Sequence, residues 1–133
     1  MDVEQNEGDK VNLQKMGALI ILALMPVLGN TEVTVKLYEE AIATDDKGAK
    51  ESILLYLSGL SHGLEWSNAM NKDNPLYCQP GKLALTTSNY VNLLNDEIIL
   101  HRNYALKDPT YSVDDKPLGL ILLRGVMNTF PCD

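Results

Sequence analysis

The sequence predicts an all-α protein, a compact bundle of about four helices held by one disulfide. Apolar residues recur at helical spacing between Thr31 and Phe130, and no segment shows the sustained polar and apolar alternation of a half-buried strand. Two segments rich in loop-forming residues, 72–82 and 104–115, interrupt this pattern. A length of 133 residues with 45% hydrophobic composition fits one folded domain.

The first helix is expected from about Thr31 to Thr44. Apolar side chains between Leu37 and Ile42 share one face, and glutamates occupy the opposite face. A polar turn over 45–48 follows, and its aspartates can cap the next helix. The sequence therefore begins this domain with a short amphipathic helix.

The second helix is expected over about 49–71 and is apolar on more than one face, which is typical of a central helix. Gly59 and Gly63 lie one turn apart and give it a flat strip that another backbone can approach closely. His62 and Glu65 make this segment too polar to span a membrane. We therefore expect the glycine strip to pack inside the domain.

The third helix should begin near Thr86 or Thr87, whose hydroxyl can act as its N-cap, and should end near Asn103. Its apolar stripe is predicted from the spacing of four residues. These are Val91, Leu94, Ile98 and His101.

The fourth helix has the clearest boundaries. Asp115 can cap it, and Pro117 sits near its first turn, where a missing N–H costs nothing. The segment 118–130 is apolar at helical spacing, and Pro131 stops it. A helix over 118–130 follows from these signals.

The N-terminal segment predicts export. Met16–Leu28 is a nearly uninterrupted apolar run, too short to cross the roughly 30 Å hydrocarbon core but typical of a signal-peptide core. We expect residues 1–29 to be a signal peptide, with cleavage before Asn30, a mature domain of 30–133 and a periplasmic location. The acidic first residues do not suit such a leader, and a translation start near Val11 would remove them. The alternative is that 16–28 forms a buried first helix.

Composition excludes several classes of function. Eleven Lys and Arg are scattered among 18 Asp and Glu, giving a net charge of −7, so nucleic-acid binding is disfavoured. No phosphate-binding glycine loop and no CxxC or HxxxH spacing occurs. We therefore expect no cofactor, no metal site and, after cleavage, no stable membrane span.

Cys78 and Cys132 are the two cysteines of the chain. An even count in an exported protein predicts a disulfide. The bridge would close a long loop, for which the chain-entropy model gives about 4 kcal/mol of stability.

Catalysis is considered and not expected. Cys78 with His62 or His101 could form a nucleophile pair, but a bonded cysteine has no thiolate. His62 and Glu65, three residues apart on a helix, could act as an acid–base pair, yet this spacing is more typical of a surface ion pair. The sequence therefore names no catalytic residue.

Four short motifs resemble a known family. They are YLSGLSHGL at 56–64, LYCQP at 76–80, KPL at 116–118 and FPC at 130–132. They are similar to the periplasmic immunity proteins that protect bacteria from type VI secretion amidase effectors, the Tai and Rap group. The resemblance extends from about Val33 to Cys132. It implies a helical, exported, disulfide-bonded and often dimeric protein that blocks the Cys-His active site of a peptidoglycan amidase. The acidic N-terminus departs from the usual leader of that family.

The predicted inhibitory surface is the second loop with the start of the fourth helix, and the first loop is the next candidate. The residues concerned are Tyr104, Asp108, Tyr111, Asp114 and Asp115, then Lys72 and Asn74. Alternatively the two tyrosines fold back on the core, and the surface then lies on the second or third helix. The competing functions are a small envelope hydrolase and a structural periplasmic adaptor.

Overall fold

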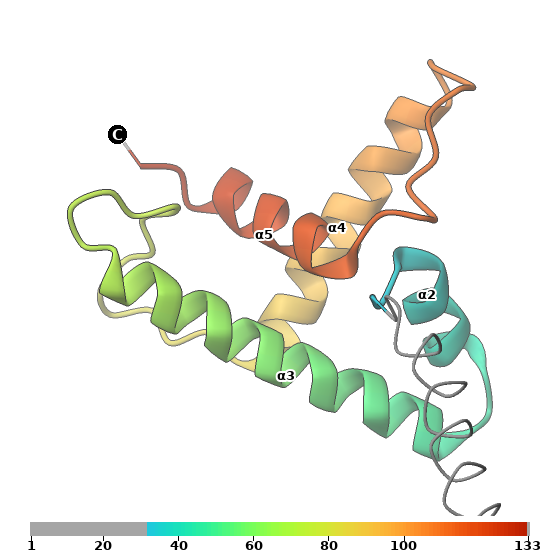
Figure 1. The fold of residues 1–133 in the computed structure, drawn as a ribbon, viewed down its shortest axis with the longest axis horizontal. Helices are drawn as coiled ribbons and strands as arrows, with labels where there is room; N and C mark the ends of the chain where they lie inside the picture. Colours follow the sequence, from blue (N-terminus) through green and yellow to red (C-terminus); the bar gives the residue numbers. More distant parts are fainter. Residues whose placement is uncertain (1–31, 133) are drawn as a thin grey trace, which may run out of the picture. The chain divides into compact units, whose positions relative to one another are not determined.

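A computed structural model describes residues 32–132, which form four helices and no β-strand (Figure 1). The helices are α2 (Val35–Ala43), α3 (Lys47–Met70), α4 (Thr87–Ala105) and α5 (Leu118–Thr129). The all-α prediction is confirmed, and all four helices occur where the sequence predicts them. The expected signal peptide at 1–29 lies outside the described residues.

The start of α2 is fixed by a segment far away in the sequence. The Thr34 hydroxyl caps the helix by accepting from the Leu37 N–H at 3.3 Å. The backbone on either side pairs with the entry to α5: the Val35 N–H donates to the Lys116 carbonyl at 3.1 Å, and the Leu118 N–H to the Val33 carbonyl at 2.8 Å. This pairing keeps residues before Thr34 extended, so α2 begins later than the sequence predicts.

One stripe of α3 faces the core, and among the described residues little covers the remaining surface of the helix. Asp46 caps the helix by accepting from the Gly48 N–H at 2.8 Å. Ile53, Leu57 and Ser61 are the buried residues of this helix, whereas several large apolar side chains on it are exposed. These are Leu54, Leu55, Tyr56, Trp66 and Met70.

The expectation that Gly59 and Gly63 pack inside the domain is wrong. Among the described residues no atom lies within 4 Å of a Cβ built at either position. Both glycines therefore lie on the open face of α3. The fold buries only one stripe of this helix, because α4 and α5 pack mainly against each other.

The core is centred on the contact between α4 and α5. Buried apolar side chains from both helices fill it, including Leu94, Ile98, Ile121 and Leu122. The close approach of two backbones occurs here, since a Cβ at Gly125 would lie 2.8 Å from the Leu93 carbonyl oxygen. Glycine is required at this position for the two helices to pack as they do.

The predicted disulfide between Cys78 and Cys132 is present, with the two Cα atoms 4.9 Å apart. It joins the α3–α4 loop to the chain after α5, and the Cys78 N–H also donates to the Phe130 carbonyl at 2.8 Å. The Asn68 side chain, at the end of α3, holds the same loop from the other side. Its amide donates to the Tyr77 carbonyl at 2.8 Å, and its oxygen accepts from the Leu76 N–H at 2.8 Å.

Candidate partner-binding surface

A chain of hydrogen bonds links the α4–α5 loop (residues 106–117) to the interior. The Asn128 amide donates to a Glu97 oxygen at 2.9 Å, and the other Glu97 oxygen lies 3.2 Å from Nε2 of His101. Nδ1 of His101 is hydrogen-bonded to the Tyr111 hydroxyl. Glu97 and His101 are only 6% and 5% exposed. The chain therefore runs from the exposed Asn128 on α5, through two buried side chains on α4, to the half-buried Tyr111 in the loop.

Every member of this polar network has a partner. Both oxygens of Glu97 and both ring nitrogens of His101 are occupied. A buried polar group that loses its partner costs about 1–3 kcal/mol, so removal of one member leaves another unpaired at that cost. The network thus fixes the position of Tyr111, and with it the middle of the loop.

The backbone of the loop is also fixed. The Asp108 carboxylate accepts from both the N–H and the hydroxyl of Thr110, and these bonds lower the pKa of Asp108. Val113 is buried, and it anchors the second half of the loop in the core. The Lys36 N–H then donates to the Asp114 carbonyl at 3.0 Å, which joins the loop to α2.

Arg102 connects three elements at the surface. From α4, its guanidinium donates to the carboxylates of Glu39 on α2 and Asp114 in the loop, the latter at 3.0 Å. The side chains are nearly half exposed. Such pairs contribute about 0–1 kcal/mol each, so Arg102 positions Asp114 more than it stabilises the fold.

The predicted partner-binding residues divide into two groups. Tyr104, Asp108 and Asp115 are exposed, as the prediction requires. Asp114 is half-buried and bound to Arg102. For Tyr111 the alternative expectation, that the tyrosine folds back on the core, is the one observed: its ring packs against the core and its hydroxyl is held by His101, with the Lys116 ammonium 5.5 Å from the ring centroid.

Two further features of this surface become visible only in the structure. Leu106, directly after α4, is 84% exposed. A cleft of about 390 Å³ lies beside the loop. It is lined by His101, Tyr104, Lys107, Asp108, Tyr111 and Arg124.

Lys72 and Asn74, the second pair of predicted contacts, are exposed in the α3–α4 loop. This loop and the α4–α5 loop lie at opposite ends of the described structure in Figure 1. The structure therefore does not bring the two predicted segments together into one surface.

The residues considered for catalysis do not assemble. His62 stacks on Trp66 with ring centroids 6.3 Å apart, while the Glu65 carboxylate accepts from the Tyr90 hydroxyl at 2.7 Å. Cys78 is bonded to Cys132 and holds no thiol. Within residues 32–132, no three metal-binding side chains gather, and no helix has the length and hydropathy to cross a membrane.

No protein-family model, curated protein or solved structure matches this chain. The family resemblance therefore stays a prediction from its short motifs. In the structure the motif at 56–64 lies on α3, the one at 76–80 in the disulfide loop, and those at 116–118 and 130–132 at the two ends of α5.

Proposed function

We propose that this protein is a periplasmic immunity protein that binds and inhibits a peptidoglycan amidase delivered by type VI secretion. The observation that carries the proposal is the surface formed by the end of α4 and the α4–α5 loop. Tyr104, on the last turn of α4 and not in the loop where the sequence placed it, and Leu106, at the start of the loop, are 52% and 84% exposed, whereas Tyr111 and Val113 hold the following part of the loop to the core. A loop of this kind can enter the cleft of an enzyme.

The physical advantage lies in preorganisation. A binding segment that is already ordered loses little conformational entropy on association, so more of its contact energy appears as affinity. An exposed tyrosine is a typical anchor for a partner's pocket, and the exposed leucine beside it adds apolar surface to the contact. The acidic side chains of Asp108 and Asp115 can steer the encounter with a basic rim.

Two observations favour binding over an envelope hydrolase built from the residues considered above. The disulfide removes the thiolate that a Cys78 nucleophile needs. Glu65 is engaged by Tyr90 rather than by His62. The same disulfide supports an oxidising compartment, which agrees with the proposed periplasmic location.

A homodimer is part of the proposal, and the open face of α3 is the surface that we assign to it. Two antiparallel copies of α3 that cross at residue 61 would pair Tyr56 of one copy with Trp66 of the other, because each lies five positions from the crossing point. Gly59 of one copy would then face Gly63 of the other. Small residues at the crossing point allow close approach of the two helices.

The test uses two variants with opposite expected readouts. Leu106→Glu should abolish inhibition of the cognate amidase in a peptidoglycan hydrolysis assay and leave the sedimentation behaviour unchanged. Leu55→Glu, on the open face of α3, should shift the protein toward monomer in sedimentation while the monomer still binds the amidase.

The contradicting results are equally distinct. Inhibition that survives Leu106→Glu, with the loop shown to be folded, would place the inhibitory surface elsewhere. A wild-type protein that forms dimers but inhibits no peptidoglycan amidase would contradict the proposal and favour a structural adaptor.

A further inference from the structure

The cleft beside the α4–α5 loop carries more positive than negative charge. Its volume is about 390 Å³, and it is lined by Lys107 from the loop and Arg124 from α5. Asp108 is the one acidic residue among the lining side chains. This local excess of positive charge runs against the net charge of the whole chain, which is −7.

Neither cation of the cleft is neutralised by the fold. Within residues 32–132, neither Lys107 nor Arg124 belongs to an ion pair. The Asp108 carboxylate is used inside the loop, where it accepts from the N–H and the hydroxyl of Thr110 at 3.0 and 2.6 Å. Both cationic side chains are exposed, so water solvates them in the free protein. An incoming anion therefore meets two charges that no neighbouring carboxylate pairs with.

Three aromatic rings give the cleft a fixed wall. The ring of His101 stacks on Tyr111 with centroids 5.7 Å apart and meets Tyr104 edge-on at 6.1 Å. Both nitrogens of His101 are held, one by Glu97 and the other by the Tyr111 hydroxyl, so these rings are ordered before any partner arrives. The Lys116 ammonium, 5.5 Å from the Tyr111 centroid, adds a third positive charge next to this wall.

The cleft is continuous with the surface that we assign to partner binding. Tyr104 belongs to both, since it lines the cleft and is 52% exposed. Leu106, the other exposed anchor, directly precedes Lys107. A partner seated on Tyr104 and Leu106 would therefore also cover Lys107 and Arg124 and remove water from them. Cations that lose water without gaining a counter-charge oppose binding, so a tight partner must supply an anion here.

We propose that this cleft receives an acidic side chain of the partner protein, whose carboxylate pairs with Arg124 and Lys107. A guanidinium can bind a carboxylate through two parallel N–H···O bonds, and the ammonium adds a point charge. The methylene groups of the acidic side chain would lie against the rings of Tyr104 and Tyr111. The inference rests on the proposed binding surface but not on the partner being an amidase. It requires a partner surface of mixed charge, acidic opposite the cleft and basic opposite Asp115.

The experiment titrates the full protein with acetyl-alanyl-glutamyl-alanine amide at low salt and follows backbone amide shifts by NMR. The control peptide carries glutamine in place of glutamate, which keeps nearly the same shape without the charge. Saturable shifts at the amides around Tyr104, Lys107 and Arg124 are expected with the glutamate peptide and not with the control. Added salt should weaken this binding, because the charges that carry it are exposed.

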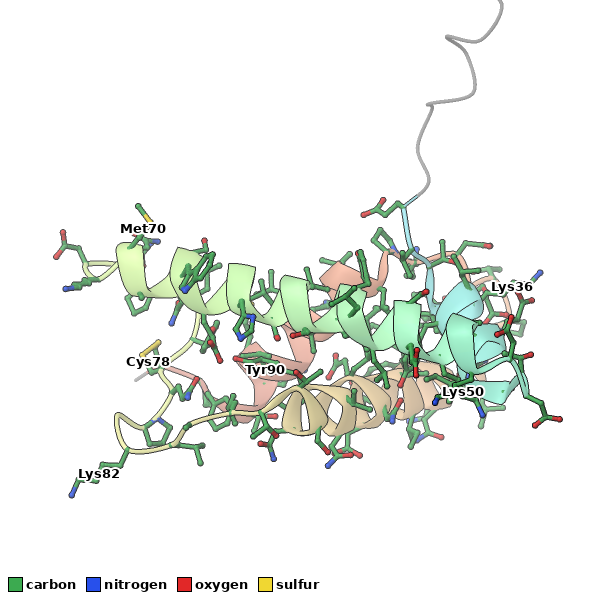
Figure 2. All side chains as sticks on the ribbon, turned by 90° about the horizontal axis from the view of Figure 1, so that it is seen from below. Lys36, Lys50, Met70, Cys78, Lys82 and Tyr90 are labelled. Carbon is green, nitrogen blue, oxygen red and sulfur yellow. A yellow bond between two sulfur atoms is a disulfide. The ribbon has the colours of Figure 1, made fainter. Side chains whose placement is uncertain are left out.

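Three variants locate the effect. Arg124→Gln should weaken binding of the glutamate peptide by about tenfold. Lys107→Gln should weaken it by about threefold, because an ammonium lacks the paired donors of a guanidinium. Lys82→Gln removes the same charge from the disulfide loop, where Lys82 points away from the helices (Figure 2), and should leave binding unchanged. All three side chains are exposed, so the melting temperature should stay close to that of the wild type.

Several outcomes would overturn the inference. These are equal binding of the glutamine peptide, equal effects of Lys107→Gln and Lys82→Gln, or shifts that map outside the cleft. Tighter binding of inorganic phosphate than of the glutamate peptide would assign the cleft to a free anion instead of a protein side chain.

Failure of this inference is distinct from failure of the proposed function. If Arg124→Gln and Lys107→Gln preserve an inhibition that Leu106→Glu abolishes, only this inference falls. A wild-type protein that binds the glutamate peptide but inhibits no amidase contradicts only the proposed function.

Discussion

The two long loops of the domain are held by different kinds of interaction. The α3–α4 loop (residues 71–86) is fixed by a covalent bond, Cys78–Cys132, and by the side chain of Asn68. The α4–α5 loop has no covalent link. It depends on the buried network that ends at Tyr111 and on the ion pairs of Arg102.

This difference has a physical consequence. In the chain-entropy model, a disulfide stabilises the fold by restricting the unfolded chain, so it responds to reductant rather than to salt. Hydrogen bonds and ion pairs act in the folded state, and the exposed ion pairs weaken as salt increases. It should therefore be possible to weaken either loop without weakening the other.

The largest effect should come from the disulfide. Replacement of both Cys78 and Cys132 by Ser should lower the free energy of unfolding by about 4 kcal/mol, measured by urea denaturation. Amide exchange should accelerate at the Cys78 N–H, which is bonded to the Phe130 carbonyl. If exchange in the α4–α5 loop accelerates equally, the two loops are not independent.

The next effect tests the contact between α4 and α5 that carries the buried network. Gly125→Ala should cost about 1–3 kcal/mol, because its Cβ would lie 2.8 Å from the Leu93 carbonyl oxygen and 3.2 Å from the Cβ of Glu97. Gly59→Ala, measured at a protein concentration low enough to keep the chain monomeric, is the control on the exposed face of α3, where the same change should stabilise the helix by about 0.5–1 kcal/mol. Thermal denaturation of both variants compares them. Similar losses for both would mean that α3 is also closely packed at Gly59.

A smaller loss is expected from the network itself. Tyr111→Phe removes only the hydroxyl that holds His101 and should cost about 1–2 kcal/mol, because Nδ1 of that buried ring loses its partner. Tyr104→Phe removes a hydroxyl from a 52% exposed side chain and should be nearly neutral. Urea denaturation measures both. Equal values for the two variants would show that the network does not fix the loop.

The smallest effect concerns the surface ion pairs. Arg102→Ala should cost at most about 1 kcal/mol at low salt, and the difference from wild type should shrink as salt is added. Lys47→Ala breaks an exposed pair with Glu51 within α3 and should change stability by about 0.5 kcal/mol or less. A loss for Arg102→Ala that does not depend on salt would mean that its methylene packing, and not its charge, holds Asp114.

Much of the fold could be predicted from local signals. The fourth helix was expected at 118–130 and is observed at Leu118–Thr129. Its predicted N-cap is wrong, because Pro117 and not Asp115 holds that position and no side chain caps the helix. Pro117 disfavours helical backbone in the residue before it, and Pro131 lacks the N–H that a further turn would need. Thr86 caps α4 as predicted, and its hydroxyl accepts from the Asn89 N–H. Capping acts over three or four residues, so it can be read directly from the sequence.

The site was less predictable, because its members meet only after folding. Glu97 and Asn128 gave no signal, since each is an ordinary polar residue on its own helix. His101 was assigned to an apolar stripe; the position is indeed buried, but its ring serves the polar network. Whether Tyr111 faces solvent or His101 depends on a partner ten residues away on another element.

The sequence by itself determined the helices, the caps of α3 and α4 and the pairing of the two cysteines, because periodicity, capping and a count of two are local or compositional properties. Tertiary structure alone decided which faces of those helices are covered. The sequence offered Gly59 and Gly63 as the place of close approach, whereas the fold uses Gly125. A glycine allows two backbones to approach closely but does not itself draw them together. Which helix packs against it depends on the burial of apolar surface over the whole domain.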